Sequence, residues 1–203
     1  ITSENVASDF NVTREKQDKF AALSFQKAAK AQAEGKFDSE IVPVKTIIKD
    51  ADGNEKEIIV SDGAAAVLLM KRKTAEKLGL PIQGKYIASA VVGCPPRIMG
   101  VGPAVAIPAV CKKAGVEIKD IDIFELNEAF ASQAVYSIEK CGLDINKVNP
   151  VGGAIAMGHP LGCTGARQIA TILPELKRQG KKLGLTTMCI GTGMGMGCII
   201  ERE

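Results

Sequence analysis

The clearest fold signal in the chain is IDIFELNEAFASQAVYSIEKCG, residues 121–142. Residues 121–126 alternate apolar and polar side chains, as strands do, and we expect a helix to open at Asn127 and run to Lys140. Gly142 stands where that helix should close. The pattern is repeated on both sides of this stretch and predicts an α/β fold in which helices pack on a sheet in layers.

The alternation of strands and helices extends from residue 61 to the end of the chain. We expect a short buried strand at 64–70, further strands at 85–92, 183–189 and 197–201, and helices at 74–78, 103–114 and 164–179. A glycine-rich loop joins the last two strands, which we expect to pair as an antiparallel edge of the sheet.

The first sixty residues have a different pattern. Thr13 is a good N-cap for a helix over residues 16–34, which Gly35 can end. Residues 41–48 and 55–60 flank the turn DADGN and predict a β-hairpin. We therefore place a domain boundary near residue 60, giving segments 1–60 and 61–203.

Composition excludes several classes of protein. The 203 residues carry 26 basic and 23 acidic side chains, a net charge of +3, and 46% are hydrophobic. This is a globular composition, neither disordered nor basic enough for a nucleic-acid surface. No apolar run approaches the roughly 18 residues of a membrane span, and no cysteine pair has zinc-finger spacing, so we expect no metal site and six reduced thiols. Because the chain opens with Ile1, we expect it to be part of a longer polypeptide.

His159 is the only histidine. Lone histidines are more often structural than catalytic. Here, however, Pro160 keeps the backbone of His159 out of the helical region and Gly158 leaves the preceding side open. A constrained glycine loop of this kind can hold an imidazole at a fixed orientation for proton transfer or hydrogen bonding.

Cys189 ends an apolar strand and begins CIGTGMG. Most free cysteines are buried and inert. At a strand end beside Gly191 and Gly193, outward-pointing amides are expected to lower the pKa of this thiol and to supply a donor to a developing oxyanion. We interpret the other cysteines as structural: Cys94, Cys111, Cys141, Cys163 and Cys198.

Asn127 has two interpretations. It is either a plain helix N-cap or a carboxamide that fixes a water or a ring nitrogen. The glycine loop GTGMGMG at 191–197 does not fit a nucleotide-binding loop, because no Lys-Ser or Lys-Thr pair and no helix follow it.

Three motifs, in this order, resemble the C-terminal signatures of the thiolase family: NEAFASQ at 127–133, GGAIAMGHPLGCTGAR at 152–167 and MCIGTGMG at 188–195. SDGAAAVLL at 61–69, IMGVGPAVAIP at 98–108 and the opening ITSENVA extend the likeness over the whole chain. The chain is most similar to the peroxisomal type of 3-ketoacyl-CoA thiolase, an acyltransferase of fatty acid β-oxidation.

The resemblance implies a role for each candidate residue. Cys189 matches the cysteine that moves protons at the CoA sulfur or the substrate α-carbon, and His159 matches the histidine that activates the nucleophilic cysteine. Asn127 matches a residue that holds a water in the first oxyanion hole, and the amide of Gly191 matches a donor in the second. Met99 and Phe130 match positions lining the acyl and pantetheine pocket.

The resemblance also implies the fold, the partners and the location. Thiolases form an α-β-α-β-α sandwich of two similar halves. This chain would supply the C-terminal half (61–203) and part of the loop domain (1–60). CoA and acyl-CoA are substrates, no cofactor is needed, and a homodimer is expected. The resemblance favours a peroxisomal location, with mitochondrial or cytoplasmic alternatives.

The likeness lacks two family features. None of the six cysteines, Cys94 included, stands in the motif of the acylated nucleophile, and the few dozen residues expected between Val60 and Ser61 are missing. We therefore expect the chain to act with an N-terminal half. The alternatives are a non-catalytic remnant that binds CoA esters or thiolase chains, and a ketoacyl synthase, a group that uses a second histidine where Cys189 stands.

Overall fold

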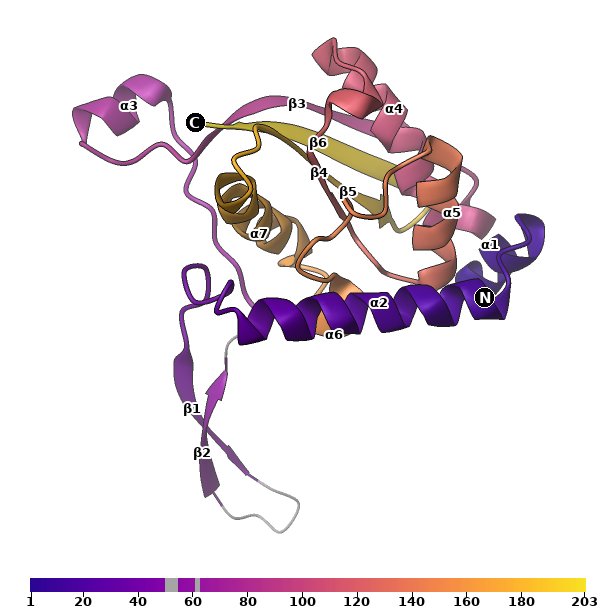
Figure 1. Ribbon diagram of the computed structural model, residues 1–203, viewed down its shortest axis with the longest axis horizontal. Coiled ribbons are helices and arrows are strands. Elements are labelled where there is room, and N and C mark those ends of the chain that lie inside the picture. Colours follow the sequence, from indigo (N-terminus) through magenta and orange to yellow (C-terminus); the bar gives the residue numbers. More distant parts are fainter. Residues whose placement is uncertain (50–54, 61–62) are drawn as a thin grey trace.

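The computed structural model describes residues 1–49, 55–60 and 63–203 and shows a mixed sheet with helices on both faces (Figure 1). In chain order the elements are α1 (Thr2–Asp9), α2 (Arg14–Ala33), β1 (Val44–Lys49), β2 (Glu55–Val60), α3 (Arg72–Lys77), β3 (Gly84–Gly93), the 3-10 turn η1 (Pro96–Val101), α4 (Gly102–Ala114), η2 (Ile118–Asp120), β4 (Ile123–Leu126), α5 (Ala131–Cys141), α6 (Ala154–Met157), α7 (Thr164–Arg178), β5 (Leu183–Ile190) and β6 (Met194–Arg202). The expected α/β layering is confirmed.

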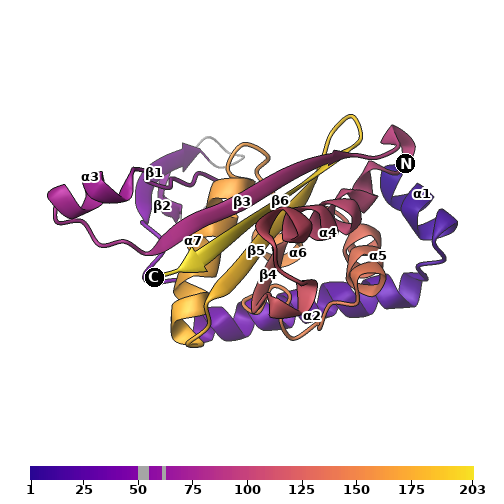
Figure 2. The same cartoon turned by 90° about the horizontal axis from the view of Figure 1, so that it is seen from above.

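The main sheet has the strand order β3-β6-β5-β4. β4 and β5 are parallel, with Leu126 opposite Thr187, whereas β5 and β6 form an antiparallel hairpin with Cys189 opposite Gly195. The antiparallel pairing of the last two strands is confirmed, but their expected place at an edge is wrong. β3 pairs along the outer side of β6, so the hairpin occupies the middle of the sheet (Figure 2).

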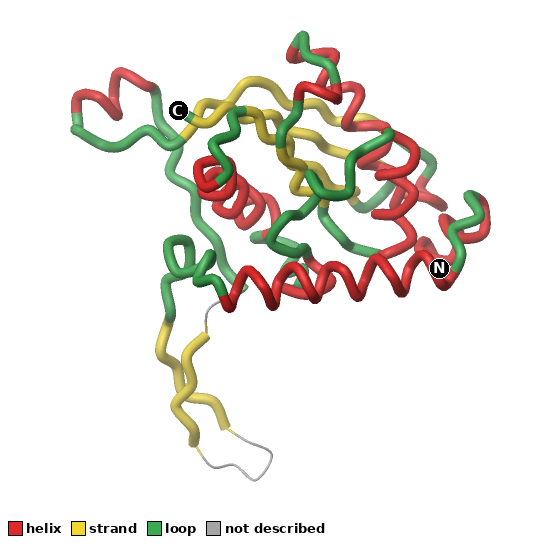
Figure 3. The backbone as a smooth tube through the Cα atoms, in the orientation of Figure 1, coloured by secondary structure: helices red, strands yellow, loops and turns green. Residues whose placement is uncertain are grey.

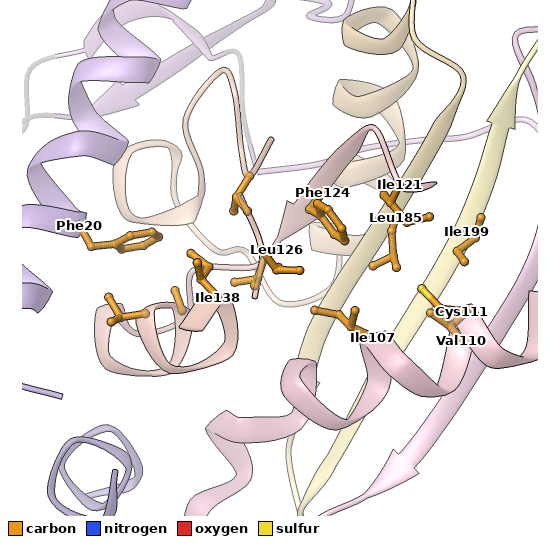
Figure 4. Packing of buried hydrophobic residues seen from close by; sticks show 14 of the residues in the cluster. Phe20, Ile107, Val110, Cys111, Ile121, Phe124, Leu126, Ile138, Leu185 and Ile199 are labelled. Carbon is orange, nitrogen blue, oxygen red and sulfur yellow. The ribbon is translucent and has the colours of Figure 1, made fainter. Parts of the chain in front are cut away.

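Alternate residues of the strands separate the two faces of the sheet. Phe124, Leu126, Leu185 and Ile199 belong to the larger core, which contains Ile107 and Val110 of α4 and Ile138 of α5 (Figure 4). Ile123 and Ile200 point to the other face and pack with Ile172 and Leu176 of α7. The strands are therefore buried on both sides where α7 covers them.

Helix α2 lies across the body and joins the N-terminal residues to it (Figure 1). The Thr13 hydroxyl accepts a hydrogen bond from the Lys16 amide at 3.3 Å, which confirms the expected cap. Phe20 is buried in the larger core. The buried Ser24 donates to Glu128 at 2.6 Å, so this helix is fixed next to the NEAF motif.

The predicted hairpin is present and projects from the body (Figure 1). β1 and β2 pair antiparallel with Val44 opposite Val60, and the turn at 50–54 lies outside the described residues. The domain boundary near residue 60 stays a prediction.

The expected buried strand at 64–70 is wrong. The segment has neither helix nor strand structure (Figure 3), and Leu68 and Leu69 are 78% and 82% exposed. An apolar run becomes a strand only when a neighbouring strand takes its backbone hydrogen bonds, and this segment has no such partner in the described part of the chain. It borders a groove of about 990 Å³ whose other walls include Ala166, Ile169 and Leu173 of α7.

The helix expected to open at Asn127 begins four residues later, at Ala131. The amide of Asn127 donates to the Thr187 carbonyl at 2.9 Å and so continues the β4–β5 pairing past the end of the strand. Phe130 is still extended, with φ −146° and ψ 142°. The plain N-cap interpretation of Asn127 is therefore excluded.

Candidate active site

Asn127 and Cys189 stand at the carboxyl ends of the adjacent parallel strands β4 and β5. Asn127 directly follows Leu126, and its backbone partner Thr187 lies two residues before Cys189. In α/β sheets the carboxyl ends of parallel strands are where ligands bind. Because β4 and β5 are parallel neighbours, Asn127 and Cys189 lie at the same end of the sheet.

The loop after α6 brings His159 to Asn127. Gly158 has φ +95°, a conformation that favours glycine, and it turns the chain out of the short helix. The His159 Nε2 lies 3.3 Å from Asn127 Nδ2, and the other ring nitrogen, Nδ1, lies 2.7 Å from the Thr164 hydroxyl. The Asn127 carboxamide therefore contacts a ring nitrogen, and its role in the site stays a prediction.

The Asn127 side chain is fully buried, yet its Oδ1 has no hydrogen-bond partner in the described part of the chain. A buried acceptor without a partner is costly, so such atoms usually have a water or ligand partner in use. Oδ1 is thus an available acceptor beside the imidazole.

The surroundings of His159 favour the neutral ring. Desolvation lowers its pKa, and the positive charge of Arg167 lowers it further. Arg167 forms an ion pair with the buried Glu125 at 2.8 Å. Burial raises the pKa of Glu125 to about 7 in spite of that pair.

Three polar residues of α7, the helix after the loop, were not singled out from the sequence: Thr164, Arg167 and Gln168. Gln168 is fully buried and donates to the carbonyls of Glu125 at 2.7 Å and Thr187 at 3.2 Å, so it links β4 to β5. The available signal was helical spacing, because the three residues recur at i, i+3 and i+4 after the loop and share one face of α7.

The expected lowering of the Cys189 pKa is wrong. Burial raises the pKa of this thiol, and the nearby Cys94 raises it further, although a backbone hydrogen bond within Cys189 acts in the opposite direction. The thiolate would lose its hydration in this position, and this destabilises it more than the nearby backbone amides stabilise it. Cys189 is therefore a thiol that holds its proton at neutral pH.

The turn between β5 and β6 presents Gly191 at the surface. Gly191 is exposed with open space around its α-carbon, and Thr192 and Gly193 have positive φ. The Gly193 carbonyl accepts a hydrogen bond from the Cys94 amide at 2.8 Å, which ties the turn to the segment before η1. The oxyanion role of the Gly191 amide stays a prediction.

Met99 and Phe130, the two expected pocket residues, belong to different parts of the chain. Met99 is half-buried on η1, and its carbonyl lies 3.8 Å from the Cys94 sulfur. Phe130 is half-buried just before α5, where its amide donates to the Gln133 side chain at 3.3 Å. Their pocket-lining roles, and the meeting of His159 with Cys189, stay predictions.

Residues 1–49, 55–60 and 63–203 contain no group of three histidine, cysteine or acidic side chains placed to hold a metal ion. No helix in those ranges has the length and apolarity needed to cross a bilayer.

Comparison with known proteins gives matches along nearly the whole chain. The family model described as "Thiolase, N-terminal domain" matches residues 1–59, and "Thiolase, C-terminal domain" matches residues 80–202. The chain is 53% identical to the peroxisomal 3-ketoacyl-CoA thiolase of Yarrowia lipolytica over 239 residues, covering 100% of this chain and 58% of that protein. It is 52% identical to the peroxisomal 3-ketoacyl-CoA thiolase of Homo sapiens, covering 99% and 56%.

Solved structures agree. The dimeric peroxisomal thiolase of Saccharomyces cerevisiae superimposes with a TM-score of 0.86 at 49% identity, covering 100% of this chain and 58% of that one. A second structure from that yeast, described as five-layered and built from two core domains of identical topology, gives 0.82 at 52% identity and covers 100% and 57%. The chain thus spans less than three-fifths of these relatives.

Proposed function

Since this chain belongs to the thiolase family, we propose that it supplies the acid–base half of a 3-ketoacyl-CoA thiolase site. The reaction is the thiolytic cleavage of 3-ketoacyl-CoA by CoA to acetyl-CoA and a shortened acyl-CoA. The observation that carries the proposal is the contact between His159 Nε2 and Asn127 Nδ2 at the carboxyl end of β4, beside β5, which has Cys189 as its last but one residue.

Cys189 acts as the acid and then as the base. When the bond between the α- and β-carbons breaks, acetyl-CoA leaves as an enolate, and the Cys189 thiol gives its proton to the α-carbon. The resulting thiolate takes the proton of the incoming CoA thiol, whose sulfur attacks the acyl group on the nucleophilic cysteine. A raised pKa suits this order, because the thiol is protonated when the enolate forms.

His159 acts on the nucleophilic cysteine, which lies outside this chain. The neutral imidazole, favoured by burial and by Arg167, takes the thiol proton during attack on the 3-keto carbon. Protonated His159 and a water bound to Asn127 Oδ1 donate hydrogen bonds in the first oxyanion hole. The Gly191 amide donates in the second oxyanion hole. No cofactor takes part.

We also propose that the partner of this chain is the N-terminal half of a thiolase. Apart from the hairpin, the described residues form one four-stranded sheet covered by helices, whereas the yeast relative is described as built from two core domains. The exposed apolar segment 63–70 and the adjoining groove are the surface left for the second domain. A homodimer of the joined halves and a peroxisomal location follow the relatives named above.

Complementation tests this function. We expect no thiolysis by the 203-residue chain alone, and conversion of 3-ketoacyl-CoA to acetyl-CoA after it is mixed with the N-terminal half of a peroxisomal thiolase. The same mixture made with a half whose nucleophilic cysteine is changed to alanine is the control. No activity in a stable complex of the two halves would contradict the proposal.

The lack of a nucleophile motif among the six cysteines favours a second candidate, a non-catalytic chain that binds CoA esters. Calorimetric titration with acetyl-CoA distinguishes the two. If the chain binds acetyl-CoA tightly but its complex with the N-terminal half gives no thiolysis, the second candidate function is supported.

A further inference from the structure

We propose that Thr164 is a positioning residue for His159: its hydroxyl holds the imidazole as the tautomer with hydrogen on Nδ1 and a lone pair on Nε2. The catalytic meaning of this inference rests on the proposed function, but the tautomer itself does not.

The hydrogen bonds of the Thr164 hydroxyl indicate which ring nitrogen carries the hydrogen. A threonine hydroxyl has one proton, and Thr164 gives it to the Pro160 carbonyl at 3.1 Å. This is the backbone bond to residue i−4 that helical threonines form. The same oxygen lies 2.7 Å from His159 Nδ1, so it accepts, and Nδ1 carries the hydrogen.

The opposite side of the ring requires the same tautomer. Asn127 Nδ2 is a donor and lies 3.3 Å from His159 Nε2, so Nε2 presents its lone pair. Two neighbours from different elements, α7 and the end of β4, thus agree. The Asn127 contact needs the Nε2 lone pair and so belongs to the neutral ring, whereas Nδ1–H can donate to Thr164 in both the neutral and the protonated ring.

Thr164 is suited to hold the ring still because it is itself fixed. It is the first residue of α7 and is buried. The Cys163 amide also donates to the Pro160 carbonyl, at 2.9 Å, and closes the loop between histidine and helix. The hydroxyl is therefore held at one place relative to the sheet.

The tautomer determines which atom does the chemistry. The lone pair on Nε2 can take a proton from the nucleophilic thiol, and the resulting N–H can then donate to the oxyanion from the same place. The Nδ1–H bond to Thr164 becomes charge-assisted in the imidazolium, and such bonds are stronger. The hydrogen bond to Thr164 thereby offsets part of the lowering of the His159 pKa that burial causes.

The charged group that faces the ring is Arg167 of α7, which is paired with Glu125 of β4 and lies near Glu40. None of these groups is changed when Thr164 is replaced. We expect Thr164→Val to lower the pKa of His159 further, since the cation loses a stronger hydrogen bond than the neutral ring does. Thr164→Ser should keep the wild-type value.

The test is nitrogen NMR on the full 203-residue chain with 15N-histidine, alone and bound to an unlabelled N-terminal half. Only one imidazole can give a signal. At high pH the spectrum should show hydrogen on Nδ1. In the complex, Thr164→Val should lower kcat by roughly ten- to a hundredfold, the scale for partners that orient a catalytic ring, with Thr164→Ser close to wild type. Thr74→Val, at an exposed threonine of α3, is the control.

A neutral ring with hydrogen on Nε2 overturns the proposal, whether or not Thr164→Val folds. An unchanged tautomer and kcat in a folded Thr164→Val variant overturn it as well. Because the tautomer is measured without turnover, the predicted spectrum in a complex that lacks thiolysis would refute the proposed function and leave this inference standing.

Discussion

Cys189 illustrates how one residue receives its chemistry from its surroundings. It is the last but one residue of β5, is half-buried and has a raised pKa. The glycine turn beside it had indicated the opposite shift, because backbone amides stabilise a thiolate. Burial is the larger effect here, and the chemical consequence is a thiol that can donate a proton as well as accept one.

Replacing this thiol tests its role. Within the complete two-half enzyme, Cys189→Ser should lower turnover at least about a hundredfold, the usual contribution of a positioned acid–base group. Folding should be nearly unchanged, as judged by the thermal unfolding midpoint. Cys198→Ser, on the neighbouring strand β6, is the control and should keep its rate. Near-normal turnover of Cys189→Ser would return the residue to the structural class.

The sequence singles out three candidate residues but not all of their contacts. His159, Asn127 and Cys189 were recognisable because each stands at a break in a regular pattern: a glycine loop, a strand-to-helix turn and a strand end. Thr164, Arg167 and Glu125 were not, since a residue inside a helix or strand gives no sign of which group it will meet from another element. Directions of pKa shifts were unpredictable for the same reason.

At the scale of elements, β4 and α7 are joined by the pair of Glu125 and Arg167. Unfolded, the carboxyl has its ordinary pKa of 4.5, whereas burial raises the folded value to about 7. Between those values the folded chain binds more protons than the unfolded chain. The free energy of unfolding must therefore fall as pH rises from 4.5 to about 7. Above that range the full cost of burying the ionised Glu125 carboxylate is present.

Glu125→Gln should remove that pH dependence. We expect wild type to lose on the order of 1 to 3 kcal/mol of unfolding free energy relative to this variant between pH 4.5 and pH 7. Urea denaturation at several pH values measures the difference. Glu139→Gln, an exposed carboxylate on α5 paired with Lys16, should follow wild type. Equal pH profiles for wild type and Glu125→Gln would contradict the assigned pKa.

Element prediction succeeded where local signals suffice and failed where they do not. The Thr13 cap located α2, and glycine follows α4 and α5 in the left-handed conformation, as expected. The segment 64–70 has the composition of a strand, but a strand also needs a neighbour. The start of α5 was missed because the amide of Asn127 bonds to β5, a contact 60 residues distant.

At the scale of the whole molecule, the uneven surface is the main feature. Helices α4 and α5 lie on one face of the sheet and α7 on the other (Figure 2). On the α7 side, segment 66–70 and α7 border an open groove. Leu68 and Leu69, 78% and 82% exposed, line this groove, and neighbouring exposed apolar side chains of this kind often mark an interaction site. This asymmetry is what a chain that shares its fold with a second half should show.

Leu69→Asp tests that surface. The side chain is 82% exposed, so the variant's own stability should change by about 0.5 kcal/mol or less. Binding to the N-terminal half should weaken about ten- to a hundredfold, because a leucine contributes roughly 1.5 to 3 kcal/mol when buried. Light scattering and calorimetry measure both. Val42→Asp, 81% exposed but outside the groove, is the control. Unaltered binding of Leu69→Asp would exclude segment 63–70 from the interface.

Helix α2 has a consequence for how such a polypeptide can be divided. Ser24 donates to Glu128 and accepts from the Gly153 amide, while Glu128 also accepts from Asn149 and from the amide of Ile155. A residue near the beginning of the chain thereby anchors the stretch that leads into the histidine loop. A cut between α2 and the His159 loop would separate these hydrogen-bond partners and leave the imidazole less firmly positioned. A working pair of fragments therefore has to keep α2 and the His159 loop on the same fragment.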